Sequence, residues 1–111
     1  MPKHQLTVTQ ALSRLPGPEG ERFVELFSHG TLSVELYAPR GTDPQTPHTR
    51  DEVYVVVAGL GQFRNGAERH PFAQGDLLFV PAGVTHRFEE FSDDFAAWVI
   101  FYGPEGGEAG T

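Results

Sequence analysis

The sequence has no cysteine, and it has only one methionine and one tryptophan among its 111 residues. Without cysteine the chain cannot form a disulfide bond, a thiolate zinc site or a cysteine nucleophile, which removes several functional classes at once. Imidazole nitrogens and side-chain oxygens remain as the groups that can bind a metal ion.

Long apolar runs and excess positive charge are also missing. No run of about 18 apolar residues could span a bilayer, and residues 1–5 lack the apolar stretch of a signal peptide. A cytoplasmic location is therefore expected. Eight basic residues stand against 15 acidic ones, for a net charge of −7. This balance argues against nucleic acid or an anionic membrane surface as the main partner.

The motifs of several common enzyme classes are absent as well. There is no phosphate-binding glycine loop followed by Lys-Ser/Thr, no Gly-x-Ser-x-Gly elbow and no dinucleotide fingerprint. No long stretch keeps a helical period, and turn residues recur about every eight to twelve residues, which is typical of an all-β protein. A chain of this length has room for one compact domain.

The apolar segments between turns predict the strands. Asn65-Gly66 carries a strong hairpin signal, residues 39–47 are expected to be irregular, and residues 11–15 allow one helical turn that Pro16 would end. Strands are expected over residues 6–8, 23–27, 32–37, 52–57, 62–64, 67–70, 77–80, 85–91 and 95–102. The single domain, residues 1–111, would have its barrel core at about 22–102, an N-terminal strand and loop over 1–21 and a loose C-terminal tail over 103–111.

His48, Glu52 and His86 have the residue types and the spacing of a metal site. In an extended strand, alternate side chains share a face. If residues 46–56 form such a strand, one face carries Thr46, His48, Arg50, Glu52, Tyr54 and Val56. His86 follows a Pro-x-Gly turn and can face this set from another strand. Imidazole and carboxylate together suit Fe, Mn, Ni, Zn or Cu. The alternative is a hydrogen-bonded polar cluster without metal, which is costly to bury unless a proton compensates.

These segments resemble the two sequence motifs of the cupin family. His48, Glu52 and Gly59 fit the second His, the Glu and the closing Gly of the first motif. The second motif is matched at Gly75, Pro81, Gly83 and His86, with Glu90 where Asn is usual. The resemblance implies a double-stranded β-helix, the cupin jelly-roll barrel.

The resemblance also implies a site and a range of activities. One divalent metal ion would be held by His48, Glu52 and His86, with Thr46 at the position of the missing first His. A metal-dependent enzyme acting on a small molecule, with a dioxygenase as the leading candidate, is expected. The alternatives are a small-molecule binding or sensor protein without turnover, and a sugar or sugar-phosphate isomerase or epimerase.

Tyr54, Arg50 and Glu90 are the candidate catalytic residues. Tyr54 either offers its phenol to a substrate or fills the barrel. Arg50 binds a substrate carboxylate or phosphate, or it is a solvated loop arginine beside Asp51. Glu90 is either an acid near the metal or a carboxylate at the rim, which we favour.

A homodimer is expected from the edge strands that such a barrel leaves open. The alternating segment 6–9 could pair across a two-fold axis and cover one of these edges.

Overall fold

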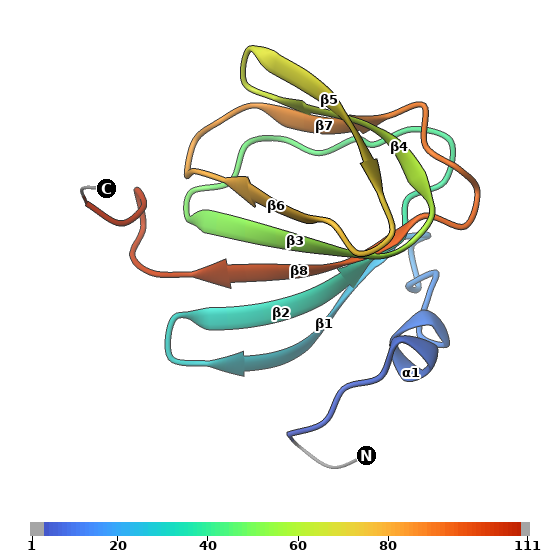
Figure 1. Cartoon of the computed structure of the whole chain (residues 1–111). Coiled ribbons are helices and arrows are strands. Elements are labelled where there is room, and N and C mark those ends of the chain that lie inside the picture. The colour runs from blue at the N-terminus through green and yellow to red at the C-terminus, as the bar shows by residue number, and fades with distance from the viewer. Residues whose placement is uncertain (1–3, 110–111) are drawn as a thin grey trace.

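A computed structural model describes residues 4–109 of the chain and confirms the predicted all-β jelly-roll fold in a single compact domain (Figure 1). In this part of the chain, eight strands follow one short helix. The elements are α1 (Val8–Leu12), β1 (Phe23–His29), β2 (Leu32–Tyr37), β3 (Asp51–Ala58), β4 (Leu60–Asn65), β5 (Glu68–Ala73), β6 (Leu77–Val80), β7 (His86–Glu89) and β8 (Ala96–Tyr102).

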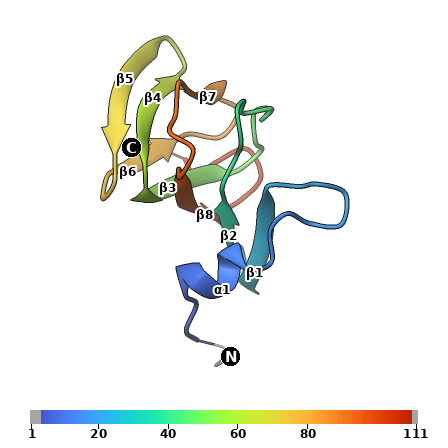
Figure 2. The same ribbon diagram turned by 90° about the vertical axis from the view of Figure 1, so that its right-hand side faces the viewer.

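The strands form two antiparallel sheets, and alternation of side chains along each strand gives each sheet one face toward the barrel interior. The larger sheet has the order β1-β2-β8-β3-β6 and the smaller one has the order β5-β4-β7 (Figures 1 and 2). On β3, Glu52, Tyr54 and Val56 are buried in the interior, whereas Val53 and Val55 lie on the other face. The two inner faces enclose the core.

Aromatic rings fill the interior between the two sheets. Phe63 and Phe88 of the smaller sheet have ring centroids 4.6 Å apart, and Phe88 lies 4.9 Å from Tyr54 of the larger sheet. Phe95, just before β8, lies 4.6 Å from Phe88. All four side chains are almost fully buried, so this cluster joins the sheets through the hydrophobic effect.

Two turns show why the sequence places glycine where it does. The Asn65-Gly66 hairpin is confirmed, with Asn65 paired to Glu68 across the turn. Gly59 joins β3 to β4 at φ +89°, and a Cβ atom there would lie 2.6 Å from the Cα atom of Phe95. Only glycine fits this corner.

The predicted strand over Leu6–Val8 is wrong, because a helix begins at Val8. Thr7 caps this helix, its hydroxyl accepting a hydrogen bond from the Gln10 backbone N–H at 3.2 Å. The N-cap at Thr7 and the burial of Ala11 favour a helix here more than the apolar–polar alternation of residues 6–9 favours a strand. The edge-strand argument for a homodimer is lost with it. No helix among residues 4–109 has the length and apolar character of a membrane span.

The C-terminal tail is not loose over residues 103–108, contrary to expectation. The Gly106 N–H donates to the Thr49 carbonyl at 2.6 Å, and the Glu108 N–H donates to the Asp51 carboxylate at 2.8 Å. Asp51 lies at the start of β3 and also accepts from the Ala82 N–H at 2.9 Å. These backbone hydrogen bonds hold the tail against the barrel and lower the pKa of Asp51. Residues 110–111, also assigned to the tail, lie outside the described part of the chain.

Candidate metal centre

Three separate parts of the chain bring the predicted ligands together. Glu52 points inward from β3, and His86 begins β7 on the opposite sheet. His48 does not share a strand with Glu52 as expected, because β3 starts only at Asp51. Its carbonyl accepts from the Gly83 N–H at 2.7 Å, so this backbone is bonded to the turn before β7 and not to a strand ladder.

The ligand atoms converge although the expected strand face does not form. His48 Nδ1 lies 3.0 Å from Glu52 Oε1, and His86 Nε2 lies 3.3 Å from the same oxygen. One ligand atom from each residue lies within 4.8 Å of the other two. The centroids of the two imidazole rings are 5.2 Å apart. The geometry therefore gathers two nitrogens and a carboxylate around one point.

The hydrogen bonds of this cluster leave a position for a cation. His86 Nδ1 donates to the Val84 carbonyl at 2.9 Å, which fixes its proton there and leaves Nε2 with a lone pair in the neutral ring. That lone pair faces a carboxylate oxygen. His86 Nε2 and Glu52 Oε2 are both buried without a hydrogen-bond partner. Buried acceptors without a donor are costly, and a divalent cation bound by this cluster would satisfy both. The residues thus fit a metal ion.

His48 is the ligand that connects the cluster to solvent. Its side chain is 33% exposed, whereas that of Glu52 is 1% exposed. The hydrogen bond to Glu52 and the negative charges of Glu52 and Glu35 raise the pKa of His48, although partial burial opposes this. A ligand entering from solvent would meet His48 first.

A buried polar network holds the segment that carries His48. Asp43 is 2% exposed and accepts hydrogen bonds from the Tyr37 hydroxyl and, at 2.8 Å, from the Phe88 N–H of β7. Gln45 donates its amide to Asp43 at 2.9 Å and accepts from the Tyr54 hydroxyl at 2.8 Å. Burial and the Asp43 carboxylate raise the pKa of Tyr37 above its usual range. The irregular segment is thereby fixed to both sheets.

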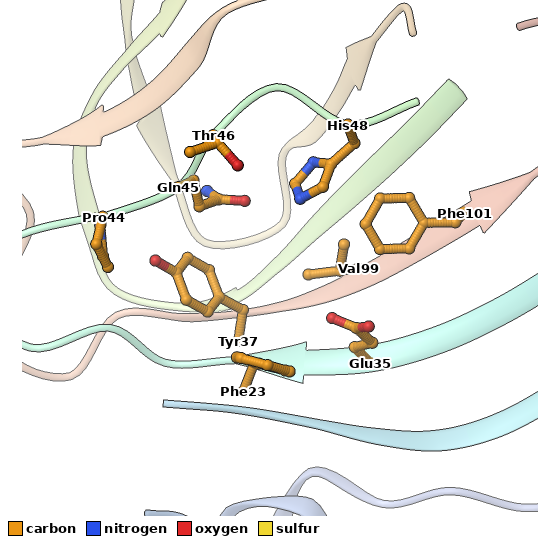
Figure 3. Close-up of a pocket in the computed structure, with 9 residues that line it drawn as sticks. All are labelled: Phe23, Glu35, Tyr37, Pro44, Gln45, Thr46, His48, Val99 and Phe101. Atoms are coloured by element: carbon orange, nitrogen blue, oxygen red, sulfur yellow. The ribbon is translucent and has the colours of Figure 1, made fainter. Parts of the chain in front are cut away.

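A pocket of about 360 Å³ lies against this segment, with His48 in its wall (Figure 3). Glu35 faces the pocket from β2, and partial burial together with Glu25 raises its pKa, with His48 acting in the opposite direction. The residues that line the pocket are Phe23, Glu35, Tyr37, Pro44, Gln45, Thr46, His48, Val99 and Phe101.

The sequence reasoning missed Glu35, Asp43 and Gln45. Alternation along β2 was a usable signal for Glu35, since Ser33, Glu35 and Tyr37 share the inner face. No such signal existed for Asp43 and Gln45, because their positions depend on contacts made by an irregular segment.

Thr46, at the position of the missing first His, lies in the pocket wall beside His48 (Figure 3).

The three candidate catalytic residues lie in three separate surroundings. The Tyr54 hydroxyl donates to Gln45, and burial together with Glu52 raises the pKa of Tyr54 well above its usual value. Arg50 donates to the Thr31 carbonyl and lies over the Phe101 ring, and it is not among the pocket residues. Glu90, 73% exposed, pairs with Arg69. The catalytic roles of Tyr54, Arg50 and Glu90 stay predictions.

The chain resembles known proteins over most of its length. Residues 33–102 match the family described as the cupin domain. An uncharacterized protein of Streptomyces coelicolor is 39% identical over 100 residues, which cover 83% of this chain and 95% of that protein. Acireductone dioxygenase of Pseudomonas aeruginosa is 41% identical over 64 residues, but these cover 53% of this chain and only 35% of that enzyme.

A solved structure supports the same assignment at the level of the fold. A cupin-2 domain protein from Shewanella frigidimarina superposes with a TM-score of 0.67 at 17% identity, covering 88% of this chain and 94% of that one. The match over residues 33–102 includes strands of both sheets, though not β1, and all three candidate metal ligands. The chain therefore belongs to the cupin domain family.

Proposed function

We propose that this protein is a metal-dependent enzyme of the dioxygenase type that acts on a small molecule in the pocket beside His48. The observation that carries the proposal is the pair of buried, unpartnered acceptors, Glu52 Oε2 and His86 Nε2. Two imidazoles and one carboxylate form the ligand set of non-haem iron oxygenases. The similarity to one dioxygenase over 64 residues supports the same class.

His48, Glu52 and His86 would hold one divalent ion, which is Fe, Mn, Ni, Zn or Cu by ligand type. When bound, such an ion supplies Lewis acidity toward a chelating substrate and, if it is ferrous iron, access to dioxygen chemistry. Glu52 would neutralise part of the charge of such an ion, and the Val84 carbonyl keeps His86 in the tautomer whose Nε2 can bind it. Thr46 and Glu35 reach the pocket from either side of His48 and would orient the substrate by hydrogen bonding.

The charge of the pocket favours some substrates over others. None of its nine described lining residues is Lys or Arg, and Glu35 brings a carboxylate. An anionic substrate would meet no opposite charge there, and a sugar phosphate is therefore disfavoured. Phe23, Val99 and Phe101 supply apolar walls. A neutral molecule with adjacent hydroxyl or carbonyl oxygens fits this combination best.

The first test is metal content. Elemental analysis of untagged protein purified without chelator should find about one equivalent of a transition metal per chain, either as isolated or after adding back ferrous, nickel or zinc ions. His86→Ala should abolish it. His29→Ala is the matched control, because His29 is exposed at the end of β1 and is not part of the cluster. Protein that takes up no metal in any form contradicts the proposal.

The second test separates an enzyme from a sensor. Metal-loaded protein is mixed with neutral enediols and catechols and with their carboxylated analogues, while oxygen uptake and product are followed. Turnover of a neutral compound that is lost in His86→Ala supports the enzyme. Binding of the same compound with no product in any metal form favours the sensor. Preference for the carboxylated analogues would contradict the assignment of substrate charge.

A further inference from the structure

The backbone that carries His48 is held by other parts of the chain. Residues 47–50 precede β3 and lie outside its strand ladder. The Gly83 N–H donates to the His48 carbonyl at 2.7 Å, and the Gly106 N–H donates to the Thr49 carbonyl at 2.6 Å. The first donor belongs to the turn before β7, and the second belongs to the C-terminal tail after β8. The position of His48 therefore depends on both of these segments.

The carboxylate of Asp51 joins the same two segments. Asp51 is buried, and its Oδ1 atom accepts from the Ala82 N–H at 2.9 Å while its Oδ2 atom accepts from the Glu108 N–H at 2.8 Å. Ala82 belongs to the turn over residues 81–84, and Glu108 belongs to the tail over residues 103–108. Hydrogen bonds to an ionised acceptor are stronger than those between neutral groups. One side chain thus ties the turn and the tail to the start of β3.

The tail has a packed position against this carboxylate. Figure 1 shows it curling at the end of the larger sheet where β3 begins. The Gly103 N–H donates to the Thr31 hydroxyl at 3.1 Å, which fixes the start of the tail. At Gly107, where φ is +91°, a Cβ atom would lie 3.0 Å from Asp51 Oδ1 and 3.1 Å from the Ala82 Cβ atom. Only glycine allows the tail to come this close to Asp51.

We propose that Asp51 is a positioning residue of the metal centre and that it acts through the tail and the turn. This inference rests on the proposed function, because it takes His48, Glu52 and His86 as the ligands of one ion. The tail fixes the backbone next to His48. The turn leads to Val84, whose carbonyl accepts from His86 Nδ1 at 2.9 Å. Two ligands that lie far apart in sequence are thereby held by a single carboxylate.

His48 is the ligand that depends most on this support. Its side chain is 33% exposed, whereas Glu52 and His86 are buried in the barrel. A cavity of about 380 Å³ lies between the His48 backbone, the turn and the tail, so close packing does not fix His48 from that side. Its orientation is left to the backbone hydrogen bonds. Loss of groups that orient metal ligands typically lowers metal affinity about 10–100-fold.

The experiment breaks the contact from each side. Gly107→Ala adds a methyl group against Asp51 and changes none of the ligands, and Asp51→Ala removes the acceptor. Gly20→Ala is the matched control, because Gly20 has a similar φ of +85° but a Cβ atom there would meet nothing within 4 Å. The affinity for Zn²⁺ is measured by competition with a chromogenic chelator. Both test variants should raise the dissociation constant at least about tenfold, and the control should change it less than about twofold.

Two further readouts separate positioning from a general loss of stability. A Gly107→Ala/Asp51→Ala double variant should bind Zn²⁺ no more weakly than the weaker single variant, because both substitutions break the same contact. With one equivalent of Cu²⁺, the electron paramagnetic resonance spectrum of wild type should show two imidazole nitrogens. In the test variants, part of the molecules should show only one, since His48 is no longer held in place.

The outcomes distinguish this inference from the proposed function. A wild type that binds no metal overturns both. A wild type that binds metal, with test variants that bind it equally tightly, overturns this inference alone. So do strictly additive losses in the double variant, or weaker binding in which both nitrogens remain. If Asp51→Ala does not fold by circular dichroism, Gly107→Ala gives the same decision through affinity and the Cu²⁺ spectrum, because it changes only the tail.

Discussion

Replacing Glu52 by Gln should separate the cost of the metal-free cluster from the stability that metal binding adds. In the wild-type cluster, Glu52 Oε1 accepts from His48 at 3.0 Å and Oε2 is buried without a partner. An unsatisfied buried polar group costs about 1–3 kcal/mol, and more if it is charged. An amide keeps an oxygen that accepts from His48, and it removes the buried negative charge that the metal-free cluster leaves uncompensated.

The metal-free variant should therefore be as stable as wild type, or up to about 2 kcal/mol more stable. With metal present, the wild type should be the more stable of the two proteins. A free metal concentration about 100 times the dissociation constant stabilises the folded wild type by about 2.7 kcal/mol. For a chain of this length, 1 kcal/mol corresponds to about 4 °C, so the midpoint of thermal unfolding should rise by about 11 °C. The Glu52→Gln variant should show almost none of this rise.

The assay is thermal unfolding followed by circular dichroism, with and without the metal identified by elemental analysis. Glu89→Gln is the matched control, because Glu89 pairs with Arg64 and Arg69 on the exposed side of β7. It should lose no more than about 1 kcal/mol and should keep the full response to metal. Two results would refute the reasoning. One is a Glu52→Gln variant that still responds fully to metal. The other is a metal-free Glu52→Gln variant destabilised by several kcal/mol. That result would mean that the Glu52 carboxylate already stabilises a hydrogen-bonded cluster in which no metal is needed.

Further predictions concern the surroundings of the site. Thr46→His should raise metal affinity at least about tenfold in a competition titration with a chromogenic chelator, because it adds an imidazole beside His48; unchanged or weaker affinity would contradict this. Asp43→Ala should cost about 3 kcal/mol or more in urea unfolding, since it leaves the Phe88 N–H buried and unpaired, and a loss below about 1 kcal/mol would be incompatible with that role. The lowered pKa of Asp51 contributes stability above its unfolded value of about 4, and this is lost as pH falls through the folded value. The stability difference between wild type and Asp51→Asn should thus shrink on acidification, and a difference that grows would show the opposite sign of shift.

Most of the fold could be predicted because its strands are local patterns. The β2 and β6 segments were predicted to the residue, and the Asn65-Gly66 turn fixed one hairpin register. The error at Leu6–Val8 has a physical origin. Four alternating residues fit a strand and the first turn of a helix equally well, and the contact of α1 with β2 decides between them.

The candidate site was predicted as a set of residues but not as a geometry. His48, Glu52 and His86 do meet, yet His48 reaches the cluster from an irregular segment and not from a strand face. The bonds that hold this segment, from Asp43 to Tyr37 and to the Phe88 backbone, join parts of the chain that are far apart in sequence. Sequence spacing carries no information about such contacts.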